Sequence, residues 1–175
     1  MASFGDWQWT SADTARVYVN EQEVGKYYFN AQGVHVGDAA QIQLAAGIRW
    51  EIIRDLYVSG NVTYFTKNFS EFDPLSLSPD NPDKPPYLDE DGNPRESWKI
   101  PDYALVDMNA GYTWRIKKVM LDFRASVMNL LNTQYISDAQ NNDTYSTSYQ
   151  DFDAKSAGVF FGMGRRFNIS VRVSF

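Results

Sequence analysis

The 175-residue sequence has no cysteine and a single histidine, and these two shortages exclude several kinds of chemistry. Without cysteine there is no disulfide, no thiolate nucleophile and no cysteine-ligated metal. One histidine excludes multi-histidine metal sites and leaves His35 as the only base for a Ser-His-Asp triad. Since His35 lies between Gly33 and Gly37 in a predicted loop, we expect no enzyme and no catalytic, cofactor or metal site.

Long apolar runs and export signals are also missing. No window approaches the roughly 18 consecutive apolar residues of a transmembrane helix. The first ten residues, MASFGDWQWT, have neither the basic start nor the apolar centre of a secretion signal. For an exported protein, Met1 is therefore expected to be an internal start within a longer reading frame.

Positive charge is scarce, whereas aromatic residues are abundant. The net charge is −6 and the pI is about 4.7, which argues against nucleic acid as a partner, because phosphate binding needs clustered Lys and Arg. Aromatic residues make up 15% of the chain and include 11 Tyr and 5 Trp. Both types favour boundaries between an apolar and a wet environment.

The clearest pattern is the alternation over residues 165–175. Phe167, Ile169, Val171, Val173 and Phe175 occupy every second position, so a strand here has one apolar and one polar face. Its length of about ten residues suffices for a tilted strand to cross a bilayer. The final aromatic is similar to the carboxy-terminal signal of bacterial outer-membrane barrels, so these five residues are predicted to form a membrane-assembly signal.

The same alternation predicts about six strands in all. The others cover residues 41–53, 56–69, 104–115 and 119–131, with an interrupted first strand within 3–19. Short turns at 54–55 and 116–118 alternate with long loops at 21–39, 71–100 and 135–164. Short connections on one rim and long ones on the other are typical of outer-membrane barrels.

The distribution of aromatic and charged residues favours lipid on the apolar side. Trp50 and Trp114 lie on the apolar face just before a short turn, and Phe175 ends a third strand of the same direction, so we predict an interfacial aromatic girdle. The opposite face carries charges such as Arg49 and Arg124. Because burying these charges in a dry core would cost several kcal/mol each, we expect that face to line a wet lumen.

The predicted fold class is therefore all-β: an antiparallel transmembrane β-barrel segment of about six strands. The smallest such barrels have about eight strands, and unpaired strand edges do not persist in hydrocarbon. We thus expect the carboxy-terminal part of a larger barrel.

Three runs carry a resemblance to a known family. Pro101 and Tyr103 precede the pair 106–107, the run Asn-Leu-Leu-Asn at 129–132 is followed by Tyr135, and Gly164-Arg165 opens a strand that ends on Phe. In this order they resemble the end of a TonB-dependent outer-membrane receptor. Residues 5–9 and 35–41 are similar to the branch of that family found in Bacteroidetes-like bacteria.

The resemblance implies a barrel of about 22 strands around an amino-terminal plug, in the bacterial outer membrane. The implied function is active uptake of a scarce nutrient, such as an iron–siderophore complex, cobalamin or a glycan. The implied partners are outer-membrane lipid, the barrel-assembly machinery, the rest of the barrel and plug, and TonB through the plug. Because neither a plug nor a TonB-contacting segment is recognisable, this chain alone is not expected to transport.

Two other classes remain open: a small independent or oligomeric outer-membrane pore, and a soluble lipocalin-like binding barrel. Two loops also carry local signals. The acidic run at 89–94 is read as a solvated hairpin, with an incomplete calcium loop as the alternative. The candidate ligand-loop residues are Tyr145, Tyr149, Asn141 and Asn142, with an exposed polar loop as the alternative.

Overall fold

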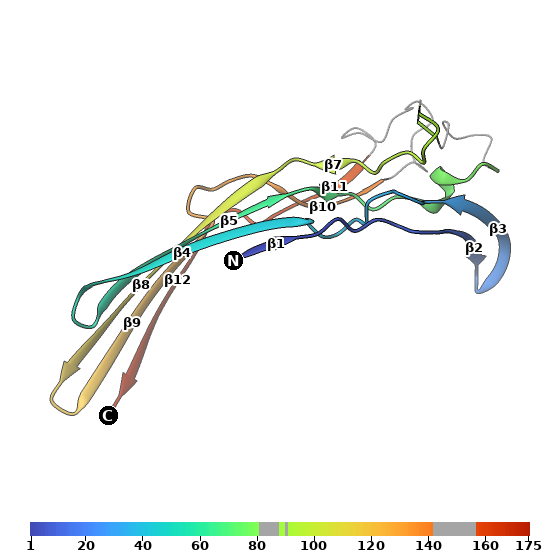
Figure 1. The fold of residues 1–175 in the computed structure, drawn as a ribbon. Coiled ribbons are helices and arrows are strands. Elements are labelled where there is room, and N and C mark those ends of the chain that lie inside the picture. Colours follow the sequence, from blue (N-terminus) through green and yellow to red (C-terminus); the bar gives the residue numbers. More distant parts are fainter. Residues whose placement is uncertain (81–87, 90, 142–156) are drawn as a thin grey trace.

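The computed structural model describes residues 1–80, 88–89, 91–141 and 157–175, and over these it is an all-β, antiparallel protein. A six-stranded sheet with the order β1-β4-β5-β8-β9-β12 dominates the fold (Figure 1). Its strands are β1 (Ala2–Phe4), β4 (Ile42–Ile53), β5 (Leu56–Thr66), β8 (Tyr103–Ile116), β9 (Val119–Met128) and β12 (Arg166–Ser174). The sheet is open, with β1 and β12 at its edges, so the described strands do not close into a barrel.

Three two-stranded sheets and a short helix lie beyond one end of the long sheet, and we call this region the cap (Figure 1). The cap contains β2 (Ala12–Val19) with β3 (Gln22–Asn30), β6 (Asn68–Phe69) with β7 (Lys99–Ile100), β10 (Ile136–Asn141) with β11 (Ala157–Phe161), and the 3₁₀ helix η1 (Pro74–Leu77). The β4–β5 and β8–β9 turns and the carboxy terminus lie at the other end. Among the described residues, no helix is long and apolar enough to span a bilayer.

The two short turns lie where the sequence predicts them. Asp55 and Lys117 have positive φ angles of 68° and 55°, which let the backbone reverse within a few residues. β4 then pairs with β5 and β8 with β9 along most of their lengths. The predicted strands at 41–53, 56–69, 104–115, 119–131 and 165–175 are thus present, with small differences at their ends.

The predicted first strand is wrong beyond its beginning. Only Ala2–Phe4 joins the long sheet, whereas Ala12–Val19 forms a hairpin with β3. Asn20 and Glu21 both adopt positive φ, the geometry of a two-residue hairpin turn, although Glu rarely takes that conformation. The predicted loop at 21–39 therefore contains β3. Likewise, the predicted loop at 135–164 contains β10 and β11, which pair with each other.

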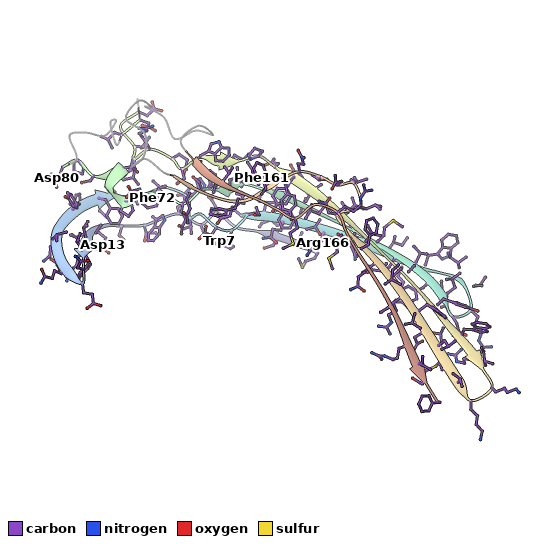
Figure 2. The ribbon with its side chains drawn as sticks, turned by 180° about the vertical axis from the view of Figure 1, so that it is seen from behind. Trp7, Asp13, Phe72, Asp80, Phe161 and Arg166 are labelled. Carbon is purple, nitrogen blue, oxygen red and sulfur yellow. The ribbon has the colours of Figure 1, made fainter. Side chains whose placement is uncertain are left out.

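The buried apolar core lies in the cap and not beneath the long sheet. Ala31, Val34 and Leu77 are almost fully buried, and Phe29 and Phe72 pack against them. In contrast, no residue of β4, β5, β9 or β12 is buried. Figure 2 shows side chains projecting from both faces of this sheet without another layer over them. The long sheet therefore has two uncovered faces.

Candidate functional site

The first candidate functional surface is the apolar face of the long sheet. The ladder register aligns apolar side chains across five strands in rows such as Trp50–Val58–Ala110–Ala125–Ile169. The side chains are open to their surroundings: Ile169 is 82% exposed and Trp50 66%. A continuous apolar surface over five strands is far more than the scattered apolar residues of an ordinary protein surface. It requires an apolar partner.

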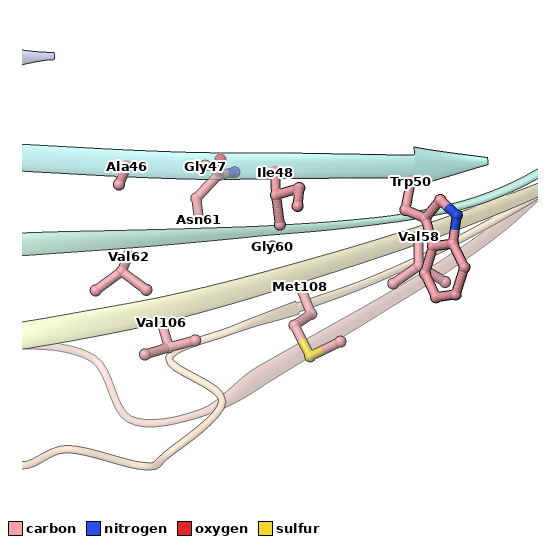
Figure 3. A pocket seen from close by; sticks show the side chains of 10 residues that line it. All are labelled: Ala46, Gly47, Ile48, Trp50, Val58, Gly60, Asn61, Val62, Val106 and Met108. Carbon is pink, nitrogen blue, oxygen red and sulfur yellow. The ribbon is translucent and has the colours of Figure 1, made fainter. Parts of the chain in front are cut away.

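This apolar face is not flat. Gly60 lies between Ile48 and Met108 in one cross-strand row, so the missing side chain leaves a hollow of about 550 Å³. Figure 3 shows the side chains of Trp50 and Val106 among those that rim it. Almost all of the hollow's surface is apolar, which suits hydrocarbon and not water.

The predicted girdle residues share one face, although they do not share one row. Trp50 lies in the row of Ile169, whereas Trp114 lies in the row of Val173, four residues further along β8. Phe175 follows two residues after Val173, on the same side if the alternation continues. Their interfacial role and the assembly signal at 167–175 stay predictions.

The opposite face is polar and forms the second candidate surface. Arg49, Asn109, Arg124 and Asn168 contribute to a polar hollow of about 470 Å³. These side chains alternate with those of the apolar face along the same strands. The long sheet thus presents two opposite chemistries to two sides, as the sequence pattern predicts.

Asn129, directly after the end of β9, joins two strands to the segment before β12. It is buried and has a φ of 50°. Its backbone N–H donates to Asp107 Oδ1 (2.8 Å), and its Nδ2 donates to the carbonyls of Thr133 (2.9 Å) and Met163 (3.2 Å). The Thr133 N–H donates back to Asn129 Oδ1 (2.8 Å). The first Asn of the Asn-Leu-Leu-Asn run therefore ties β8, β9 and the segment before β12 together.

Tyr135, which follows that run, has a packing role. Its ring stacks on Tyr103 at 4.5 Å, and Tyr103 stacks on Phe65 at 4.8 Å. A Cβ atom on Gly162 would overlap the Tyr135 ring, so a side chain at this position would have to displace the ring from its stack. The aromatic ladder and this glycine join the long sheet to the β10–β11 hairpin.

His35 lies in a charged cluster of the cap that sequence reasoning missed. Its Nδ1 is 2.5 Å from Glu96 Oε2, and its Nε2 is 3.1 Å from Asp6 Oδ1. The ring also stacks on Phe69, with 4.3 Å between ring centroids. Because its two ring nitrogens face carboxylates from different parts of the chain, the cluster joins three segments that are distant in the sequence. No sequence motif signals contacts over such separations.

A second cap cluster brings Asp38, Glu71 and Asp138 together. Burial raises the pKa of Asp138, and the hydrogen bond and negative charge of Asp38 raise it further. Burial likewise raises the pKa of Asp38, with added contributions from Glu71. Within the described part of the chain, no group of His, Asp or Glu side chains is arranged to hold a metal ion.

The predicted ligand loop lies almost entirely outside the described residues. Tyr145, Tyr149 and Asn142 belong to the segment 142–156, and Asn141 ends β10, where its backbone pairs with Ala157.

In the acidic run, Asp89 and residues 91–94 form a turn, in which the Asp89 N–H donates to the Asn93 carbonyl (2.8 Å). Asp89 Oδ1 accepts hydrogen bonds from the N–H groups of Asp91 (3.0 Å) and Asn93 (2.8 Å), and Leu88 forms a bridge with Pro94. The Asp89 carboxylate is therefore engaged in closing the turn.

Comparison of the sequence with protein-family models and with curated proteins finds no match.

Proposed function

We propose that this chain forms part of the wall of a transmembrane β-barrel in the bacterial outer membrane, within a receptor of the TonB-dependent type. In this proposal the apolar face of the long sheet contacts lipid and the polar face lines the lumen. The cap then lies on the extracellular side, where the longer connections of such barrels are found.

One observation carries the proposal: the long sheet has an exposed apolar face and an exposed polar face over the same strands. In water, the apolar face would require a covering layer, whereas the described core lies in the cap. A membrane wall resolves this conflict, because lipid covers one face and water the other. The motif order at 100–175 supports the more specific family proposal.

The two edge strands of the long sheet, β1 and β12, each lack a partner strand on one side. β1 and β12 each expose unpaired backbone groups, which hydrocarbon does not tolerate. We therefore propose that further strands of the same receptor pair with these edges, that the barrel-assembly machinery inserts them, and that TonB acts through a plug. The receptor would take up a scarce nutrient, such as an iron–siderophore complex, cobalamin or a glycan.

The first experiment is to read the DNA upstream of the Met1 codon in the source genome. An open frame that encodes more alternating strands, a plug and a secretion signal is the expected result. A stop codon and a ribosome-binding site directly before Met1 would contradict the large-receptor proposal. It would favour the small or oligomeric pore, in which copies of this chain pair through β1 and β12.

The membrane placement has its own test. Two variants are made, one that keeps only Trp50 and one that keeps only Trp114. In reconstituted vesicles, brominated lipids are expected to quench the fluorescence of both. Trp7, in the cap and half exposed, serves as the control and should respond to the aqueous quencher iodide. Equal iodide quenching at all three positions would contradict the proposal.

A further inference from the structure

The polar hollow on the long sheet is unusually rich in hydrogen-bond donors. Arg49, Ser59, Asn109, Ser126 and Asn168 form one continuous cross-strand row across β4, β5, β8, β9 and β12. Arg124 and Ser170 extend the hollow into the adjacent row. None of the described residues that line it is acidic, although the chain as a whole carries 22 acidic and 16 basic residues.

The two arginines have no carboxylate partner among the described residues. Glu51 and Asp122 lie on the same face but do not line the hollow. Glu51 accepts from the Asp55 N–H (3.3 Å), and Asp122 accepts from Thr113 Oγ1 (2.6 Å). Guanidinium groups carry N–H donors and no acceptor, so both arginines are able to donate to an anion in the hollow.

The sheet holds Arg49 in place through its neighbours. The Arg49 guanidinium lies 3.5 Å from the centre of the Tyr57 ring, a cation–π contact that leaves its N–H edges free to donate. The Tyr57 ring in turn lies over Gly111, where a Cβ atom would come within 2.4 Å of it. Gly111 also stands directly opposite Arg124 in the ladder. The absence of a side chain at 111 therefore leaves room for the Tyr57 ring, against which Arg49 stacks.

We propose that this hollow binds a small multivalent oxyanion between Arg49 and Arg124. Two guanidinium groups suit a solute with two or more acidic groups better than a single carboxylate, because each is able to donate a pair of N–H bonds to an oxyanion. Asn109, Asn168 and the serine hydroxyls supply further donors along the same row. The inference deepens the proposed function and rests on it for one point, that this face lines a wetted lumen.

The test is calorimetric titration of the detergent-solubilised chain with sodium pyrophosphate at low salt. Arg49→Gln and Arg124→Gln should each weaken binding about tenfold or more, since a hydrogen bond to a charged group contributes about 1.5–3 kcal/mol. The matched control is Arg54→Gln, which removes the same charge from the β4–β5 turn, outside the hollow. It should change the affinity less than about twofold.

A second variant tests the positioning device without changing the charge. Gly111→Ala should displace the Tyr57 ring and Arg49 and so weaken pyrophosphate binding, while circular dichroism reports whether the sheet is intact. Should the sheet not form, Asn168→Asp places an acid in the hollow without crowding the backbone and should also weaken binding.

Two outcomes would overturn the inference: the absence of pyrophosphate binding, and an equal loss of affinity in Arg54→Gln. If pyrophosphate does not bind and a polyglutamate peptide does, the occupant of the hollow is a protein segment. Flotation of the same preparations with liposomes reports on the proposed membrane function separately. If a preparation binds pyrophosphate but does not float with liposomes, the proposed membrane function is rejected and the proposed anion site is retained.

Discussion

On β12, the neighbouring residues 170 and 171 lie on opposite faces of the sheet, one polar and one apolar. Val171 lies in the apolar row of Phe123, whereas Ser170 lies opposite Arg124 on the polar face. In an assembled barrel, Val171→Arg would place a charge against lipid and should reduce the free energy of unfolding by about 2–4 kcal/mol. Ser170→Arg should change it by less than about 1 kcal/mol, since its side chain reaches water.

Urea unfolding in lipid vesicles, followed by tryptophan fluorescence, measures both variants. Equal losses at 170 and 171 would refute the assignment of the two faces.

Asn129 combines a buried side chain with a left-handed backbone. Asn129→Ala would leave the carbonyls of Thr133 and Met163 and the Thr133 N–H without their partner and place Ala at a φ of 50°. We expect the free energy of unfolding to fall by about 2–4 kcal/mol.

The matched control for this variant is Asn132→Gly. Asn132 is exposed, its Oδ1 accepts one bond from the Arg165 N–H, and its φ of 53° suits glycine. The expected loss is about 1 kcal/mol. If the two variants cost the same in urea unfolding, Asn129 is not the central tie of this region.

At the scale of strands, period-two alternation is enough to predict most of the long sheet. Ile48, Met108 and Ile169 each belong to an uninterrupted alternation, so both the strand and its facing follow from the sequence. The cap hairpins were missed for physical reasons. β2–β3 turns through Glu21, which is uncommon at positive φ, and β10 has a polar composition that resembles a loop.

Much of the site depends on register, which the sequence does not display. The meeting of Arg49 and Arg124 in one hollow follows from the pairing of four strands, and the His35 cluster follows from contacts over 29 and 61 residues. Residue types alone indicate a polar face. They do not indicate which of its side chains meet.

The carboxylates of the cap make the attachment of the β10–β11 hairpin dependent on pH. The folded state raises the pKa of Asp138 above its ordinary value of 3.8, by burial and then by the contact with Asp38. The contribution of Asp138 to the stability of the folded state is therefore fully present below pH 3.8. It is lost as the pH rises through the folded-state pKa of Asp138. At neutral pH the cluster opposes attachment of the hairpin.

Asp138→Asn keeps an acceptor for the Ala139 N–H and removes one charge. It should increase stability at pH 7 by up to about 1 kcal/mol, with no gain at pH 3, because the site is partly exposed and screened. Amide hydrogen exchange of β10 measures this at both pH values. The comparison uses protection factors, each referred to the intrinsic exchange rate at its own pH, and larger protection of the wild-type hairpin at pH 7 than at pH 4 would contradict the sign.

For the whole molecule, the position of the core predicts the solvent that the chain requires. The buried cluster around Leu77 covers only part of the cap, whereas Ile169 and Trp50 on the long sheet are exposed. We expect a β-sheet circular dichroism spectrum in detergent micelles and aggregation in detergent-free buffer. A folded monomer in plain buffer would contradict the membrane proposal and favour a soluble binding barrel.

The strand order of the long sheet follows the order of the chain: β1, β4, β5, β8, β9, β12. No strand is inserted between two that come earlier, so the sheet is able to grow by adding one neighbour at a time. The β4–β5 and β8–β9 hairpins form from local contacts and close quickly, whereas pairing β1 with β4, β5 with β8 and β9 with β12 requires closure of much longer connections of similar length. We therefore expect the two hairpins to form first, and the joining of the hairpins to each other and to the two edge strands to be the slow steps in folding of the sheet.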